Sequence, residues 1–313
     1  MRVVSDINGL ERAAGPGTQV VVFSNQSCPN RWKRNVALLR AARSADYLVI
    51  QFSLIEVVFF ATLLGKCRLV TLDFFVVRPP KWQLPVIRWA LGRVYKLLVY
   101  FRDSSSFEAK YGLPRSRFEY VPFKVNSWEL VREAVISDGG YIFVGGRSRR
   151  DFATLFEAVK DLPYPVRVLT AHEPELLPHG SSLAGLRVPA NVEIIYKDTD
   201  TKLYVELMAN ARLVVLPIVK ETAVQAGIGV YIMGMALRKC VIISEGLGVS
   251  DVLQPHQACI IPAGSARALR DAIEALWNDD NRRAAYAEAA YSYAAPLGGE
   301  DNLRASILGA IGA

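Results

Sequence analysis

The sequence is poor in cysteine and histidine, and the few residues of these types are scattered. Its four cysteines (Cys28, Cys67, Cys240 and Cys259) form no CxxC pair and no cluster with the three histidines. This spacing argues against a zinc site and against a disulfide framework, and it fits a reducing compartment. We therefore expect no metal site.

Long hydrophobic runs are also missing. The most apolar stretch, "SLIEVVFFATLLGK" (53–66), contains Glu56 and is shorter than the ~20 apolar residues that a membrane-spanning helix needs. The N-terminus has no apolar core of a signal peptide. With 51% hydrophobic and 21% charged residues in 313, the chain has ample material for about two packed domains. These features predict a cytoplasmic protein.

Acidic residues are scarce in the first part of the chain. Residues 1–136 contain 20 Lys and Arg but 10 Asp and Glu, whereas the remaining 177 residues contain 17 and 20. Such asymmetry is typical of two domains with different partners.

The stretch 74–102 has six basic residues and no acidic residue. Pro85 suits the first turn of a helix, and on a helical wheel Trp89 lies among the cations, with Trp82 just upstream. This pattern predicts contact between residues 74–102 and an anionic membrane surface at the inner face of the cell membrane. An ordinary amphipathic helix is the alternative. The absence of helix-turn-helix, RNP or zinc signatures argues against nucleic acid.

Short strand-like runs alternate with helical ones through both halves, which predicts two doubly wound, Rossmann-like parallel sheets of the α/β class. The expected domains are 1–133, 134–290, and a C-terminal helix over 291–313 that packs back on the first domain. Helices are expected over residues 31–43, 54–65, 85–96, 104–112, 151–161, 200–210, 226–238 and 265–277. In such folds ligands bind beyond the carboxyl ends of the strands, so the expected site is the cleft between the domains.

The stretch "GGYIFVGGRSRRDFATLFEAV" (139–159) joins a predicted strand to a predicted amphipathic helix. Gly145 and Gly146 allow a close approach of the backbone, and Arg147 and Arg150 put positive charge at the helix start. Because a helix start already favours negative charge, cations there indicate a bound anion. A plain strand–turn–helix connection with solvated arginines remains the alternative.

Residues 139–290 resemble the nucleotide-sugar-binding domain of GT-B fold glycosyltransferases of the large family numbered four. The order of motifs carries the resemblance: "FVGGRSRRDFATLFEAV", then "NVEIIYKDTDTKLYVELMANARLVVLP", then "AGIGVYIMGMALRKCVIISEGLGVSDVL", and the closing "AGSARALRDAIEALWNDDNRRAAYAEAA". The resemblance implies a metal-independent GT-B glycosyltransferase with a UDP- or GDP-sugar as donor substrate and no bound cofactor. A saccharide or lipid-linked acceptor is expected, in bacterial polysaccharide or glycoconjugate synthesis.

The resemblance also assigns residues to the donor. Arg150 and Lys220 are expected to neutralise the diphosphate that leaves. The other residues expected to bind the nucleotide sugar are Gly145, Gly146, Arg147, Ser148, Tyr196, Lys197, Glu221, Gln225, Ala226 and Gly227. On the acceptor side Asp73, at the end of the predicted strand "RLVTLD", is the expected general base, if burial raises its pKa.

The sequence departs from the family pattern where a glutamate of an E-x7-E motif binds the ribose. Met233 stands at the second position of this motif, and Gln225 lies eight residues earlier. Methionine is a poor hydrogen-bond acceptor. Two alternatives therefore stay open: a non-catalytic GT-B partner subunit, and a nucleotide-sugar epimerase on the same fold.

Overall fold

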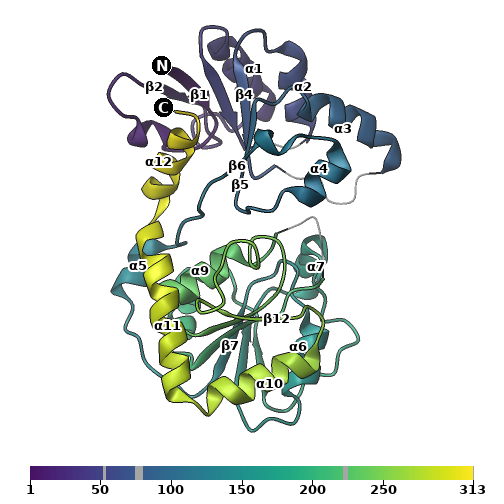
Figure 1. Cartoon of the computed structure of the whole chain (residues 1–313), viewed down its shortest axis with the longest axis vertical. Coiled ribbons are helices and arrows are strands. Elements are labelled where there is room, and N and C mark those ends of the chain that lie inside the picture. Colours follow the sequence, from purple (N-terminus) through teal and green to yellow (C-terminus); the bar gives the residue numbers. More distant parts are fainter. Residues whose placement is uncertain (52–53, 75–79, 221–224, 313) are drawn as a thin grey trace. The chain divides into compact units, whose positions relative to one another are not determined.

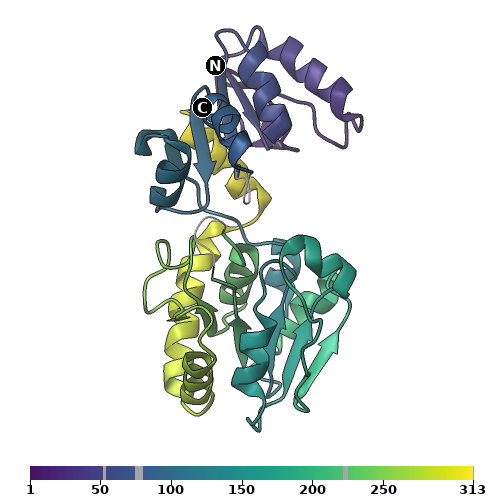
Figure 2. The ribbon, with the colours of Figure 1, turned by 90° about the vertical axis from the view of Figure 1, so that its right-hand side faces the viewer.

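The computed structural model describes residues 1–51, 54–74, 80–220 and 225–312. The described chain divides into two compact units (Figures 1 and 2). The first unit is Met1–Pro122 together with the segment that starts at Asp301, and the second is Phe123–Glu300. The division at 122/123 differs from the boundary at 133/134 that the sequence suggested, because residues 123–133 group with the second unit.

The first unit is built on a six-stranded sheet in which every pair of neighbouring strands is parallel. Its order is β2-β1-β3-β4-β5-β6, so the switch point of the winding lies between β1 and β3. The strands are β1 (Arg2–Ser5), β2 (Gln19–Val22), β3 (Tyr47–Ile50), β4 (Arg68–Leu72), β5 (Lys96–Val99) and β6 (Phe118–Tyr120). The sequence pattern did not predict β1, which has only four residues.

The helices of the first unit follow the expected pattern with one correction. They are α1 (Arg31–Ala42), α2 (Leu54–Leu63), α3 (Leu84–Leu91), α4 (Ser105–Tyr111) and α12 (Glu300–Ala310), of which α12 begins at the last residue of the second unit. The helix expected over 85–96 ends at Leu91, so that expectation was wrong at its C-terminal end. Gly92 weakens the helix there, and Lys96 already pairs with β4 as the first residue of β5.

The second unit contains another all-parallel six-stranded sheet, in the order β12-β11-β10-β7-β8-β9. Numbered from β7, this is the doubly wound order 3-2-1-4-5-6, with its switch point between β7 and β10. The strands are β7 (Ile142–Gly145), β8 (Val166–Leu169), β9 (Val192–Ile195), β10 (Leu213–Leu216), β11 (Val241–Ser244) and β12 (Cys259–Ile261). The predicted α/β class with two doubly wound sheets is confirmed.

Helices cover both faces of this second sheet, with α6 and α10 on one face and α9 and α11 on the other (Figures 1 and 2). Its helices are α5 (Trp128–Glu133), α6 (Phe152–Val159), α7 (Glu173–Leu176), α8 (Thr201–Ala209), α9 (Ile228–Ala236), α10 (Ala266–Trp277) and α11 (Asp280–Ala294). Asp151, Asp200 and Ser265 each cap a helix by accepting a hydrogen bond from a backbone N–H of its first turn. These caps fix where α6, α8 and α10 begin, close to the predicted positions.

Among the described residues, five short 3-10 helices complete the two units. They are η1 (Leu10–Ala13), η2 (Lys81–Gln83), η3 (Arg115–Arg117), η4 (Leu177–His179) and η5 (Ala295–Leu297). Within the described ranges, none of the helices is both long and apolar enough to cross a membrane.

Candidate functional site

The glycine turn after β7 lies at the carboxyl end of the strand beside the switch point of the second sheet. Gly146 has a φ of +94°, a conformation that favours glycine. A Cβ at Gly145 would overlap the Tyr204 hydroxyl oxygen and lie 2.6 Å from Tyr204 Cζ. A Cβ at Gly146 would lie 2.6 Å from Arg150 Nη2. The close approach predicted at these glycines is thus an approach to protein side chains.

Arg150 is the centre of this turn, with only 3% of its surface exposed. Its Nε donates to the Gly145 carbonyl (2.8 Å) and its Nη1 donates to the Ser148 carbonyl (2.7 Å). Its backbone N–H donates to Ser181 Oγ (2.7 Å). Burial lowers the pKa of Arg150 from its ordinary value. In the part of the chain that the structure describes, no carboxylate forms an ion pair with this guanidinium.

Backbone hydrogen bonds join the turn after β7 to the segment after β10. Asp151 N–H donates to the Pro217 carbonyl (2.9 Å), and Val219 N–H donates to the Arg149 carbonyl (3.0 Å), on either side of an antiparallel bridge between Arg150 and Ile218. The two loops that flank the switch point therefore form one short antiparallel ladder.

The start of α9 lies against this ladder. Gly227 precedes α9 with a φ of +80°, and a Cβ there would lie 3.7 Å from Arg150 Nη1. The first N–H groups of a helix are free to bind an anion. The buried guanidinium and the N-terminus of α9 are therefore neighbours, as an anion site requires.

Arg147 also lies at the carboxyl ends of the strands of the second sheet, but its side chain makes different contacts from that of Arg150. Its Nε lies 2.7 Å from Asp198 Oδ2, and 29% of its side chain is exposed. Both residues line a pocket of about 460 Å³ within the second unit. The other lining residues are Lys124, Asn126, Ser127, Gly146, Thr201, Tyr204, Gly229, Val230, Met233 and Glu300.

The remaining residues expected at the donor are spread along this edge. Ser148 Oγ lies 3.3 Å from His179 Nδ1, and Ala226 is buried next to Gly227. Tyr196 is 43% exposed after β9, where its ring stacks on His172 at 4.2 Å. Lys197 is exposed beside it, Lys220 is exposed after β10, and Gln225 is half-buried. Glu221 lies outside the described residues.

The carboxylate expected on the acceptor side belongs to the first unit. Asp73 follows β4 with a φ of +51°, and its N–H donates to the Leu98 carbonyl (2.8 Å). Its side chain is half-buried. Positive φ at a non-glycine residue is uncommon, although aspartate tolerates it better than most.

Asp6 is a second carboxylate of the first unit, which was not predicted because the sequence pattern did not predict β1, the strand before it. It follows β1 at the switch point of the sheet, where its Oδ1 accepts the Gln51 N–H (2.9 Å). Burial raises the pKa of Asp6 to about 6, and nearby Glu56 adds to this effect while Arg34 opposes it. Glu56 is itself buried and paired with Arg31.

Asp6→Asn should flatten the dependence of stability on acid pH. Because folding raises the pKa of Asp6, the folded state binds more protons than the unfolded state between about pH 4 and 6. The stability from Asp6 is therefore fully present below pH 4 and is lost as the pH rises through 6, by up to about 3 kcal/mol. Urea midpoints of the wild type and the variant from pH 4 to 7 would measure it. Glu11→Gln, which changes an exposed carboxylate of the same unit, is the control. If the urea midpoint depends on pH in Asp6→Asn as it does in the wild type, while Glu11→Gln changes that dependence, the assignment to Asp6 is wrong.

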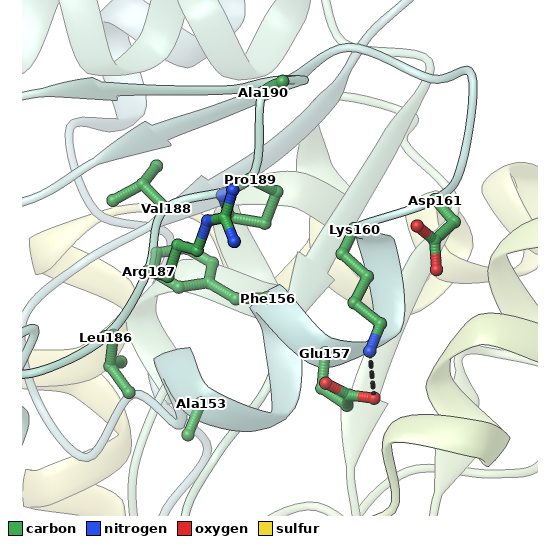
Figure 3. Close-up of a pocket in the computed structure, with 10 residues that line it drawn as sticks. All are labelled: Ala153, Phe156, Glu157, Lys160, Asp161, Leu186, Arg187, Val188, Pro189 and Ala190. Atoms are coloured by element: carbon green, nitrogen blue, oxygen red, sulfur yellow. Dashed lines mark hydrogen bonds and ion pairs between the residues drawn. The ribbon is translucent and has the colours of Figure 1, made fainter.

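A larger pocket, of about 700 Å³, lies against α6 and the segment 186–190 (Figure 3). Figure 3 shows the Lys160 ammonium directed at the Glu157 carboxylate, an ion pair of 2.8 Å, on one side of it. None of the residues expected at the donor lines this pocket. Among the described residues, no three His, Cys, Asp or Glu side chains come together as metal ligands would.

Two α/β units with parallel six-stranded sheets, the second with a glycine turn and a buried arginine at its switch point, define a protein of the GT-B fold class. Residues 142–293 match the family model of the glycosyl transferases group 1. This match confirms the resemblance to glycosyltransferases that the motif order suggested for this part of the chain.

Solved structures share the fold over almost the entire chain. HepE of Anabaena has been solved in complexes with UDP and with UDP-glucose. In the UDP complex its sequence is 15% identical to this chain, 99% of each chain is covered, and the TM-score is 0.68. A glycosyltransferase from Rickettsia africae is 12% identical, with 98% and 97% covered and a TM-score of 0.70. Sucrose-phosphate synthase from Thermosynechococcus elongatus is 12% identical, with 98% and 96% covered and a TM-score of 0.68. No curated protein matches the sequence.

Proposed function

We propose that the protein transfers a sugar from a nucleoside-diphosphate sugar to a hydroxyl group of a saccharide or lipid-linked acceptor. The observation that carries the proposal is the buried guanidinium of Arg150, which among the described residues bonds only carbonyls and lies beside the N-terminus of α9. A buried cation next to the positive end of a helix dipole is unfavourable by itself. A diphosphate bound there would neutralise both, which supports a site built for a doubly charged anion.

The chemistry follows from this placement. When the bond between the sugar and the diphosphate breaks, negative charge builds up on the diphosphate. Arg150 and the first N–H groups of α9 would stabilise that charge without rearrangement. Lys220 is exposed after β10 and would add a second cation, while Asp73 remains our proposed general base toward the acceptor hydroxyl. The complexes of HepE with UDP and UDP-glucose favour a uridine donor over a guanosine donor.

A thermal-shift panel of UDP, GDP and their sugars tests the donor class. At about 100 times its Kd, a ligand that binds only the folded state stabilises the protein by about 2.7 kcal/mol. We expect UDP and at least one UDP-sugar to raise the Tm, and the purified protein to release UDP from that sugar slowly in water. If no nucleoside diphosphate raises the Tm and no donor is hydrolysed, the proposal is wrong.

We also propose that residues 74–102 bring the protein to an anionic membrane surface on the cytoplasmic side. The side chains of Ile87, Ala90 and Leu91 form the buried face of α3. Trp82 is 74% exposed and Val86 is 47% exposed. An exposed tryptophan in a stretch rich in cations supports binding at the headgroup level of a bilayer.

Trp82→Ala should weaken binding to vesicles that contain phosphatidylserine by about tenfold, because the largest exposed ring of this stretch is removed. Co-sedimentation at fixed salt measures the effect. Trp32→Ala is the matched control, since Trp32 is 55% exposed on α1 of the same unit but lies outside the stretch. Equal losses in the two variants, or no binding by the wild type, would refute membrane contact through residues 74–102.

A further inference from the structure

The pocket of about 700 Å³ in the second unit is a groove between two walls (Figure 3). One wall is the outer face of α6, with Ala153 and Glu157, and it continues to Lys160 and Asp161 at the end of the helix. The other wall is the segment 186–190, which belongs to no helix or strand and which we call the strap. The proposed function assigns nothing to this groove, because none of the residues expected at the donor lines it.

Each wall of the groove carries one charge that is left over, and the two charges have opposite signs. On the α6 wall, Lys160 pairs with Glu157 at 2.8 Å, so these two side chains neutralise each other. Arg187 on the strap and Asp161 on the α6 wall are exposed, and among the described residues neither forms an ion pair. Figure 3 shows Arg187 and Asp161 on opposite sides of the groove. A partner that fits this face therefore has to offer both a carboxylate and a cation.

The strap also presents apolar surface beside an open sheet edge. Val188 is 43% exposed, and Leu186 and Pro189 line the groove next to it. The strap leads directly into β9, which is the edge strand of the second sheet and pairs only with β8 in the described part of the chain. Exposed apolar side chains and an uncovered strand edge are both features of a surface that another chain covers.

We infer that a second copy of the chain docks on this face about a two-fold axis, with the strap of each protomer against the α6 wall of its partner. A two-fold interface brings the same surface of both protomers together, so every contact occurs twice. Arg187 of one protomer then pairs with Asp161 of its partner, and the reverse pair forms on the other side of the axis. A purely anionic or purely cationic partner would satisfy only one wall, whereas a second copy carries both charges. The same contact covers the exposed apolar surface of the strap.

Sedimentation velocity of the full chain tests the inference, and the wild type should change from monomer to dimer between about 1 and 100 μM. Arg187→Glu and Asp161→Arg should each weaken the dimer by at least about 100-fold, because each puts two like-charge contacts across the axis. The double variant Arg187→Glu/Asp161→Arg exchanges the two charges and should dimerise again. Arg132→Glu is the control, since Arg132 is a 58% exposed side chain of α5 that does not line the groove. All of these side chains are on the surface, so the far-UV circular dichroism of the variants should match that of the wild type.

Recovery of the dimer in the double variant, after its loss in both single variants, supports the pairing of Arg187 with Asp161. A wild type that stays monomeric over the whole concentration range overturns the inference and leaves the groove to another occupant. A dimer that survives both single charge reversals, or that Arg132→Glu disrupts equally, places the interface elsewhere and also overturns it. If the double variant stays monomeric, the two side chains do not meet across the axis, and the inferred arrangement is wrong.

Discussion

Arg150→Ala is expected to lower the affinity for a nucleoside diphosphate by at least about 100-fold. The variant removes the cation beside the N-terminus of α9, and losing one partner of a buried charge pair costs about 3–5 kcal/mol. It also leaves the carbonyls of Gly145 and Ser148 without their donor, so the free energy of unfolding should fall by about 2–4 kcal/mol. Calorimetric titration gives the first quantity, and urea unfolding gives the second.

Two further variants separate charge from folding. Arg150→Lys keeps the charge but has no planar fork with which to reach both carbonyls. We therefore expect it to lose most of the same stability but to keep part of the affinity for the nucleotide. Arg167→Ala removes a surface arginine of the same sheet, 41% exposed and 3.3 Å from Glu193, and should leave both quantities nearly unchanged. If Arg150→Ala binds the nucleotide as the wild type does, Arg150 does not hold the diphosphate.

Gly145→Ala is expected to destabilise the second unit by about 2–4 kcal/mol, even though Gly145 is not among the glycines with positive φ. The new Cβ would overlap the Tyr204 hydroxyl oxygen and lie 2.7 Å from Phe143 Cε1. Both rings are buried, so neither can move aside cheaply. Urea unfolding of the variant measures the loss.

Gly246→Ala is the matched control, because Gly246 lies two residues beyond β11 of the same sheet and no atom of the described residues lies within 4 Å of an added Cβ. It should change the stability little or raise it slightly, by about 0.4–1 kcal/mol. The double variant Gly145→Ala/Tyr204→Phe should recover part of the loss, since only the contact with the hydroxyl disappears. If Gly145→Ala is as stable as Gly246→Ala, the Tyr204 side chain can move away from the new Cβ at little cost, and the prediction is wrong.

Much of the fold could be predicted because its signals are local. The apolar spacing of Phe152, Leu155, Phe156 and Val159 predicts α6, and all four side chains are buried. The regular alternation of such helices with short apolar runs predicts the parallel sheets. The end of α3 could not be placed in the same way, because pairing of Lys96 with β4 decides it and that partner is distant in the sequence.

The site was harder to predict because its contacts are not local. The sequence points to Gly145 and Arg150, and both lie at the switch point of the second sheet. It does not show that Tyr204, 59 residues further along, fills the space over Gly145, or that Ser181 accepts the N–H of Arg150. On the first unit, the raised pKa of Asp6 depends on burial and on Glu56, 50 residues away. A single carboxylate in a sequence carries no sign of such surroundings.

The short ladder between Arg150 and Ile218 has a consequence for how a donor would bind. Its two backbone bonds tie the turn after β7 to the segment after β10, so these loops form a preorganised cradle before any ligand arrives. The entropy cost of ordering these loops then belongs to folding, so it does not weaken the binding of a ligand. The amide protons of Asp151 and Val219 would exchange with solvent only when that cradle opens, which makes them natural reporters of its rigidity.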